Sequence, residues 1–259
     1  MIRLKEMVRL ICLFLLVGLA GPFDAEGGLI FRSYILKDVE QLVVVVTDEW
    51  NSSEGKLMCY TREGRKSWRP QWKEPVPVVL GSKGLAWGRG AYAENGKRLK
   101  KEGDGCAPAG IFKIGKIYGE SRTLPGGSNY PYHRITKLDA WVDDPENPFY
   151  NRHVRIGHKE KEPVWFQSQR MRLGDPAYKW LIEIRHNSDP PKPGYGSAIF
   201  FHVERRAGRK TAGCTAMKLI DLERIISFLK EDKNPHYILL PNSEYKRKRK
   251  KMNFPDFSY

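Results

Sequence analysis

One cysteine and one histidine are spaced for nucleophilic catalysis. Cys214 follows Gly213 in the small-residue segment 211–217, and His202 lies twelve residues upstream of the cysteine, after the apolar run 198–201. Glycine lets the chain turn tightly and lets a substrate approach closely. We expect this turn to place Cys214 at the start of a helix, where free N–H groups lower a thiol pKa and can hold an oxyanion. His202 can then take the thiol proton and return it to a leaving amine.

The competing interpretation is that Cys214 is an inert thiol, because free cysteine is among the most buried residue types. A Gly-Cys turn together with a histidine on an apolar strand favours the catalytic interpretation. Two other kinds of site are disfavoured. His133, His153 and His158 show no spacing typical of a zinc site. The glycine-rich segment 84–90 opens no helix that could cradle a phosphate.

Most of the chain is predicted to form strands. Apolar and β-branched runs bounded by turn residues predict strands at 42–47, 56–62, 76–80, 111–117, 180–184, 198–201 and 237–240. One helix is expected from an N-cap at Asp221 to a stop at Pro235. Its apolar residues have helical spacing: Leu222, Ile225, Ile226 and Leu229. Many strands, frequent Gly and Pro, and few helices predict a mostly-β fold in a single domain.

Segments 196–203 and 211–217 together resemble the catalytic core of the L,D-transpeptidase (YkuD-type) family, which pairs a histidine at a strand end with a [Ser/Thr]-x-Gly-Cys turn. Segments 84–88, 102–112 and 141–151 are similar to further parts of that family, so the resemblance covers residues 76–241. The chain differs in having Thr-Ala-Gly-Cys where many members have Ser-His-Gly-Cys. It also lacks the arginine or asparagine that many members have shortly after the cysteine.

The resemblance implies a β-sandwich-like domain with the cysteine in a groove and one helix after the cysteine turn. It implies Cys214 as nucleophile, His202 as general base and acid, and Gly213 as an oxyanion N–H donor. Gly196, Ser197, Thr211 and Asn187 become candidate substrate-binding residues. The alternative for Asn187 is a polar residue that caps a strand end.

The activity that the resemblance implies is cleavage of the bond between the diamino acid and D-alanine in peptidoglycan stem tetrapeptides. Transfer of the acyl group to an amine would make a cross-link or anchor a protein, and transfer to water would make the protein an L,D-carboxypeptidase. No metal or organic cofactor is implied. An alternative of another class is a non-catalytic, basic module that binds the cell envelope.

The N-terminal residues 1–25 have the pattern of a secretory signal peptide, with three basic residues before the apolar run 10–20. Cleavage is expected after Ala20 or Ala25, and an uncleaved anchor is the alternative. Export to the periplasm or cell envelope follows in either case. Without Cys12, an odd number of cysteines remains: either Cys59 pairs with Cys106, or all three are thiols.

The chain is strongly basic, with 45 Lys and Arg against 30 Asp and Glu and a net charge of +15. An exported basic protein meets anionic envelope polymers or lipid head groups rather than nucleic acid. Six consecutive cations at 246–251 predict a disordered tail, 246–259, that contacts such a surface, after a catalytic domain at 26–245. Four more cations between the histidine and cysteine form either a solvated loop or an attractive rim for substrate carboxylates: Arg205, Arg206, Arg209 and Lys210.

Overall fold

A computed structural model of the protein describes residues 36–91 and 98–257. The predicted signal peptide, 1–25, lies outside these residues, as do Cys12 and both expected cleavage positions. In the described part of the chain, no helix is long and apolar enough to cross a bilayer. Strands dominate it, which confirms the mostly-β prediction.

Each of the seven predicted strands overlaps an observed strand, and further elements lie between them. The strands are β1 (Gln41–Thr47), β2 (Glu54–Thr61), β3 (Arg69–Pro70), β4 (Val76–Val79), β5 (Leu85–Trp87), β6 (Ala107–Gly119), β7 (Tyr132–Arg134), β8 (Asp139–Trp141), β9 (His153–Arg155), β10 (Trp180–Ile184), β11 (Phe200–Val203), β12 (Thr215–Met217) and β13 (His236–Pro241). The α-helices are α2 (Phe166–Gln169), α3 (Leu219–Phe228) and α4 (Asn242–Met252), and three short 3₁₀ turns are η1 (Pro125–Gly127), η2 (Pro176–Tyr178) and η3 (Glu231–Lys233).

The main sheet closes on itself. Its strand order is β1-β13-β6-β10-β11-β12-β4-β2-β3, and β2 also pairs with β1. Val44 illustrates the closure, since it pairs with Ile238 of β13 on one side and with Met58 of β2 on the other. Nearly every side chain of β1 is buried, so both faces of the strand are covered, which explains its valine run.

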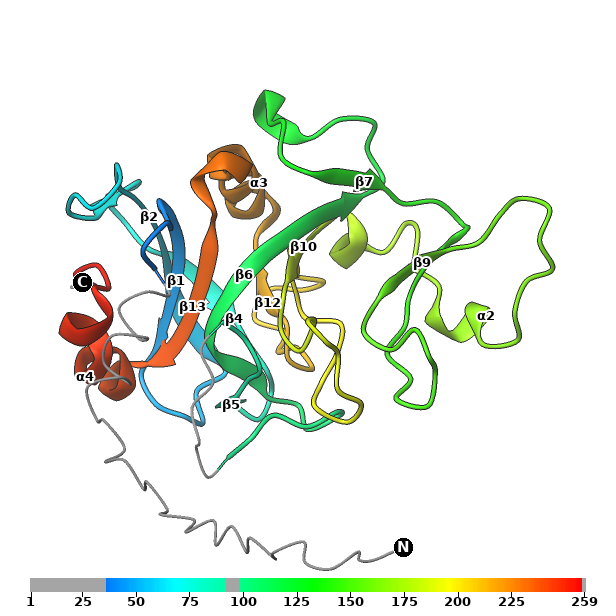
Figure 1. Ribbon diagram of the computed structural model, residues 1–259, viewed down its shortest axis with the longest axis horizontal. Coiled ribbons are helices and arrows are strands. Elements are labelled where there is room, and N and C mark those ends of the chain that lie inside the picture. The colour runs from blue at the N-terminus through cyan, green and yellow to red at the C-terminus, as the bar shows by residue number, and fades with distance from the viewer. Residues whose placement is uncertain (1–35, 92–97, 258–259) are drawn as a thin grey trace, which may run out of the picture.

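Helix α3 covers one end of this sheet (Figure 1). It begins at Leu219, two residues before the predicted cap, and Asp221 lies in its first turn. The predicted apolar face is confirmed, because Leu222, Ile225 and Ile226 are fully buried in the core. The helix ends at Phe228, well before Pro235, and the 3₁₀ turn η3 follows.

Between β6 and β10, which pair directly, the chain leaves the main sheet and forms a side lobe (Figure 1). This segment includes the separate two-stranded sheet β8–β9, helix α2 and η2, whereas β7 pairs with β6 in the main sheet and η1 packs against α3. The lobe has its own small core, formed by Ala140, Ile156 and Phe166. A second cluster, which includes Tyr118 and Phe200, packs against Trp141 and so joins the lobe to the sheet.

The prediction of a disordered tail from residue 246 is wrong for the described residues, because residues 242–252 form helix α4 beside β1 (Figure 1). Like charges repel in a run of cations, but Tyr245, Lys248 and Met252 fall on one helix face and are buried. Glu244 in the first turn pairs with Arg247 and Lys248, and the cations of the last turn match the helix dipole. The domain therefore extends beyond the predicted boundary at residue 245.

Replacing Tyr245 by Ala should destabilise the protein by about 3 kcal/mol, the usual cost of deleting a buried aromatic side chain. Its ring stacks on Phe254 at 5.3 Å, and its hydroxyl donates to the Pro255 carbonyl. Chemical denaturation measures the change. Lys250→Ala, on the exposed face of the same helix, is the matched control and should stay within about 0.5 kcal/mol of the parent. Equal stability of both variants would show that α4 does not pack on the domain.

Candidate active site

The parallel pairing of β11 with β12 brings the predicted nucleophile and base to one face of the sheet. Phe201 pairs with Thr215 and His202 with Ala216. Because side chains alternate along a strand, Phe201 points into the main core, while His202 and Cys214 both line a cavity on the other face. Cys214 directly precedes a strand, so the expectation that it begins a helix is wrong; α3 starts only after β12.

Thr211 closes the turn that presents Cys214. Its hydroxyl donates to the Cys214 carbonyl at 2.7 Å and accepts the Gly213 N–H at 3.1 Å. Its backbone is tied to Leu80 and Ser82 at the end of β4. Gly213 has φ +153°, and a Cβ there would lie 2.9 Å from the Cys106 carbonyl oxygen, so only glycine fits. The Gly213 N–H that we predicted as an oxyanion donor is thus bonded to Thr211 in this structure, and that role stays a prediction.

The cavity has a volume of about 620 Å³ and lies between the sheet and the side lobe. The lobe contributes a wall that sequence reasoning did not find, formed by Trp141, Asp143, Met171, Arg172 and Tyr178. Trp141 packs edge-on against Phe200 of β11 with ring centroids 4.7 Å apart. Nothing in the spacing of these residues links them to Cys214, because only the long excursion between β6 and β10 brings them there.

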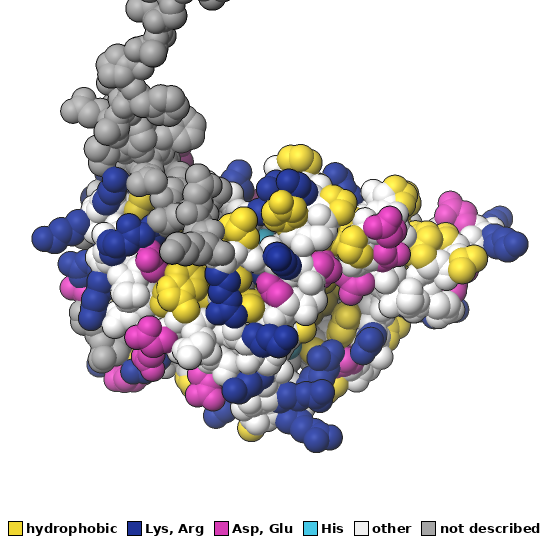
Figure 2. Space-filling model, turned by 90° about the horizontal axis from the view of Figure 1, so that it is seen from below, with side chains coloured by type: hydrophobic (Ala, Val, Ile, Leu, Met, Phe, Trp, Pro, Cys, Tyr) yellow, Lys and Arg dark blue, Asp and Glu magenta, His cyan; other side chains and the backbone are white. Residues whose placement is uncertain are grey.

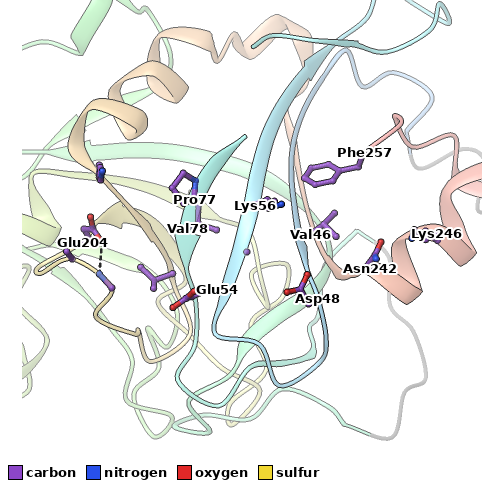
Figure 3. A pocket seen from close by; sticks show the side chains of 15 residues that line it. Val46, Asp48, Glu54, Lys56, Pro77, Val78, Glu204, Asn242, Lys246 and Phe257 are labelled. Carbon is purple, nitrogen blue, oxygen red and sulfur yellow. Dashed lines mark hydrogen bonds between the residues drawn. The ribbon is translucent and has the colours of Figure 1, made fainter. Parts of the chain in front are cut away.

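A larger cavity, of about 1020 Å³, lies elsewhere, along β2 and β4 and beside α4 (Figure 3). Its side chains include Glu54, Lys56 and Phe257, and no cysteine or histidine is among the residues that line it. We therefore place the candidate active site in the smaller cavity, which contains both Cys214 and His202.

The thiol of Cys214 is held by the backbone of its neighbour strand. Its Sγ donates to the Ala198 carbonyl at 3.3 Å and accepts the Phe200 N–H at 3.4 Å. Burial raises the pKa of Cys214 to about 11, although the Phe200 N–H favours the thiolate. The thiol is therefore protonated at neutral pH, the opposite of what the expected helix start would produce.

His202 is a neutral base aligned by its own strand. Its Nδ1 lies 2.8 Å from the Val203 carbonyl oxygen, so Nδ1 holds the proton and Nε2 is left as the acceptor. Burial lowers the pKa of this imidazole. His202 pairs with Ala216, and Cys214 precedes Ala216 by two residues, an offset of about 6.6 Å along the strand. In keeping with this offset, both hydrogen-bond partners of the Cys214 thiol are backbone atoms of the chain around β11. The free site is thus a neutral thiol and a neutral imidazole.

Three of the candidate substrate-binding residues do not line the cavity. Asn187 is buried and uses its whole amide within the fold, donating to the Lys192 and Gly196 carbonyls and accepting from Lys192 N–H and Arg89 Nε. These four bonds join loop residues and do not reach β10, so the structure gives Asn187 a role in holding the loop, and its role toward substrate stays a prediction. Ser197 donates to Glu102, and Gly196 has φ +92° in the same turn. Thr211 does line the cavity.

His186 anchors the same loop. Its Nδ1 accepts the Arg89 N–H and its Nε2 donates to the Tyr195 carbonyl. Burial lowers the pKa of His186 to about 3, so it stays neutral at any physiological pH. Together with Asn187 it fixes the segment that enters β11, and so acts on the site through the backbone.

Cations surround the mouth of the cavity. Arg205 is held by Asp175, with Nη2–Oδ2 at 2.8 Å and Nε–Oδ1 at 2.9 Å. Arg209 and Lys210 line the cavity as the sequence suggested, whereas Arg206 does not. Arg172 is a further cation of the wall that the lobe provides. The positive field of Arg205 also lowers the pKa of Cys214, against the larger effect of burial.

The remaining histidines are arranged differently from expectation, whereas the cysteines match one of the two alternatives that the sequence left open. His133 and His153 lie together, because both imidazoles contact the carboxylate of Asp139. His158 lies in an exposed loop away from them. Cys59, Cys106 and Cys214 are all free thiols, so Cys59 and Cys106 are not paired.

Comparison with known proteins gives one finding. The family model described as the L,D-transpeptidase catalytic domain, YkuD, matches residues 45–238. This range includes the end of β1, all of β2 to β12 and the first half of β13, with both cavity residues His202 and Cys214. Neither a curated protein nor a solved structure matches the chain significantly.

The neutral thiol predicts a particular pH dependence of alkylation. Iodoacetamide should modify Cys214 slowly at pH 7, and its rate should rise about tenfold per pH unit toward the raised pKa near 11. Peptide mass mapping of quenched samples gives the rate at this residue. A rate that is already constant between pH 6 and pH 8 would show a preformed thiolate–imidazolium pair and contradict the assignment.

Proposed function

Because the chain belongs to the YkuD family of L,D-transpeptidase catalytic domains, we propose that it is an exported cysteine acyltransferase of the cell wall. Its substrates are peptidoglycan stem tetrapeptides, and the bond broken joins the diamino acid to the following D-alanine. The observation that supports this best is the cavity in which a partly buried thiol and a neutral imidazole share one face of adjacent strands.

The protonation states define the order of the proton transfers. Both groups are neutral in the free site, so Nε2 of His202 accepts the thiol proton as Sγ of Cys214 attacks the carbonyl carbon. The C–S bond forms and the carbonyl oxygen takes the negative charge. Collapse of this intermediate breaks the C–N bond, and His202 returns its proton to the departing D-alanine amine. The acyl group then remains on Cys214 as a thioester.

An amine from a second stem or from an anchored protein then captures the thioester, again with His202 as the base. Water in place of the amine would make the protein an L,D-carboxypeptidase. The charges of the cavity suit the donor stem. Arg172 and Arg205 can pair with stem carboxylates, and Asp143, the acidic side chain among the lining residues, can pair with the free ammonium of the diamino acid.

We propose a second contact, with anionic lipid or envelope polymer, through α4. Lys246, Arg247, Lys250 and Lys251 are exposed, whereas Lys248 is buried beside Glu244 and the ring of Trp87. Lys and Arg side chains are also spread over the face shown in Figure 2, with Asp and Glu among them. The attraction of the protein to an anionic surface is therefore spread over this face, and the exposed cations of α4 add to it from one ordered helix.

Release of D-alanine from a soluble disaccharide tetrapeptide tests the proposed reaction. Cys214→Ala should abolish release, and His202→Gln should lower the rate by about 100-fold or more, the usual size of a lost general base. Cys106→Ala removes a buried thiol outside the cavity and is the matched control, which should keep the parental rate. Parental turnover by the Cys214→Ala protein would refute the assignment and would favour the non-catalytic envelope-binding module.

Neutralising the exposed cations of α4 tests the surface contact without removing the packed residues of the helix. A variant with Gln at 246, 247, 250 and 251 should bind vesicles containing an anionic lipid more weakly, since each cation near such a surface contributes on the order of 1 kcal/mol. Turnover of the soluble peptide should not change. Added salt should weaken the parent in the same way, and equal sedimentation of both proteins with vesicles at low salt would exclude the contact.

A further inference from the structure

A second cluster of chemically competent side chains lies behind the lobe wall of the candidate active site. Nε2 of His133 is 2.7 Å and Nε2 of His153 is 2.8 Å from the same oxygen, Oδ1 of Asp139. The two imidazole centroids are 4.6 Å apart. These residues come from β7, β8 and β9, so three separate strands aim their ligand atoms at one point.

The carboxylate is oriented as metal-binding carboxylates are. Asp139 is fully buried, and its other oxygen, Oδ2, accepts both the N–H and the hydroxyl of Thr136 at 2.7 Å. This leaves Oδ1 toward the imidazoles, and such outer hydrogen bonds fix ligand orientation in metal sites. The imidazoles are each about a fifth exposed, so water can reach the cluster.

The spacing is close to that of an occupied site. Two ligand atoms bound to one zinc ion at 2.0–2.2 Å in tetrahedral geometry lie about 3.3 Å apart. The imidazoles would have to withdraw from Oδ1 by about half an ångström, which their partial exposure permits. Two imidazoles, one carboxylate and one water make up a known type of open zinc coordination.

The surrounding charges select the class of metal. The guanidinium of Arg155 is 3.7 Å from Oδ2, and the positive charge of Lys116 also acts on His153, so the neighbourhood is not acidic. Hard cations such as Mg²⁺ and Ca²⁺ need several oxygen ligands and would bind poorly here. Zinc and similar transition metals bind imidazole nitrogen well and tolerate a single carboxylate.

We propose that His133, Asp139 and His153 form a binding site for a zinc-class divalent metal ion, which fastens the β8–β9 hairpin to β7. The site is separate from the thiol chemistry and does not depend on the proposed reaction. It would act on the groove through Trp141, which pairs directly with His153 across the hairpin and lines the cavity of Cys214. The bound metal would thus stiffen the wall against which the substrate lies.

Titration of the full-length, chelator-treated protein with Zn²⁺ by calorimetry tests the site. We expect saturable binding of one ion per chain and a rise in melting temperature. His133→Gln and His153→Gln should each weaken binding by at least about 100-fold, beyond the usual loss for an outer partner, and Thr136→Val should weaken it by about 10-fold. His158→Gln, which changes an exposed histidine outside the cluster, should leave the affinity unchanged.

Nuclear magnetic resonance of the wild-type imidazoles decides the question even where a variant folds poorly. Zn²⁺ should shift the signals of two of the six histidines, His133 and His153. With Co²⁺ in place of Zn²⁺, no thiolate-to-metal charge-transfer band should appear. The proposal would be overturned if Zn²⁺ showed no saturable binding or if both glutamine variants kept the parental affinity. It would also be overturned by a thiolate-to-metal band or a shift of the His202 signal, since either would place the metal at Cys214.

Discussion

The parallel pairing of β11 with β12 is the constraint on which the candidate active site depends. In a parallel ladder, residues in register point to the same face, so one register places His202 and Cys214 together in the cavity and Phe201 and Met217 in the core. A slip of one residue would reverse these faces. Thr211 and Gly213 hold this register at the turn, and the buried pair His186 and Asn187 holds the entry to β11.

Burial then determines how the site can work. Removing the thiol and the imidazole from water raises the pKa of Cys214 and lowers that of His202, so charge separation is unfavourable before substrate arrives. A neutral pair keeps the thiol poorly reactive toward other electrophiles. The site gains its reactivity only when a carbonyl lies beside Sγ, because proton transfer and attack can then proceed together.

Local patterns predicted a large part of this structure. The β-branched run of β1, the apolar spacing of α3 and the Gly-Cys turn each reflect a rule that acts over a few residues. What could not be predicted depends on contacts between distant segments. The start of a strand after Cys214 follows from pairing with β11, and the order of α4 follows from Tyr245 and Met252 meeting the body of the domain. The convergence of His133 and His153 on Asp139 likewise needs the β8–β9 hairpin.

Intact mass spectrometry of the wild-type protein mixed with a tetrapeptide stem, quenched in acid, tests the central claim most directly. The account predicts one covalent adduct per chain with the mass of the tripeptide acyl group, located at Cys214 by peptide mapping and released by an amine. The account would be contradicted if the protein stayed unmodified at all times while a known L,D-transpeptidase formed the adduct under the same conditions. An adduct that persists in Cys214→Ala would also contradict it.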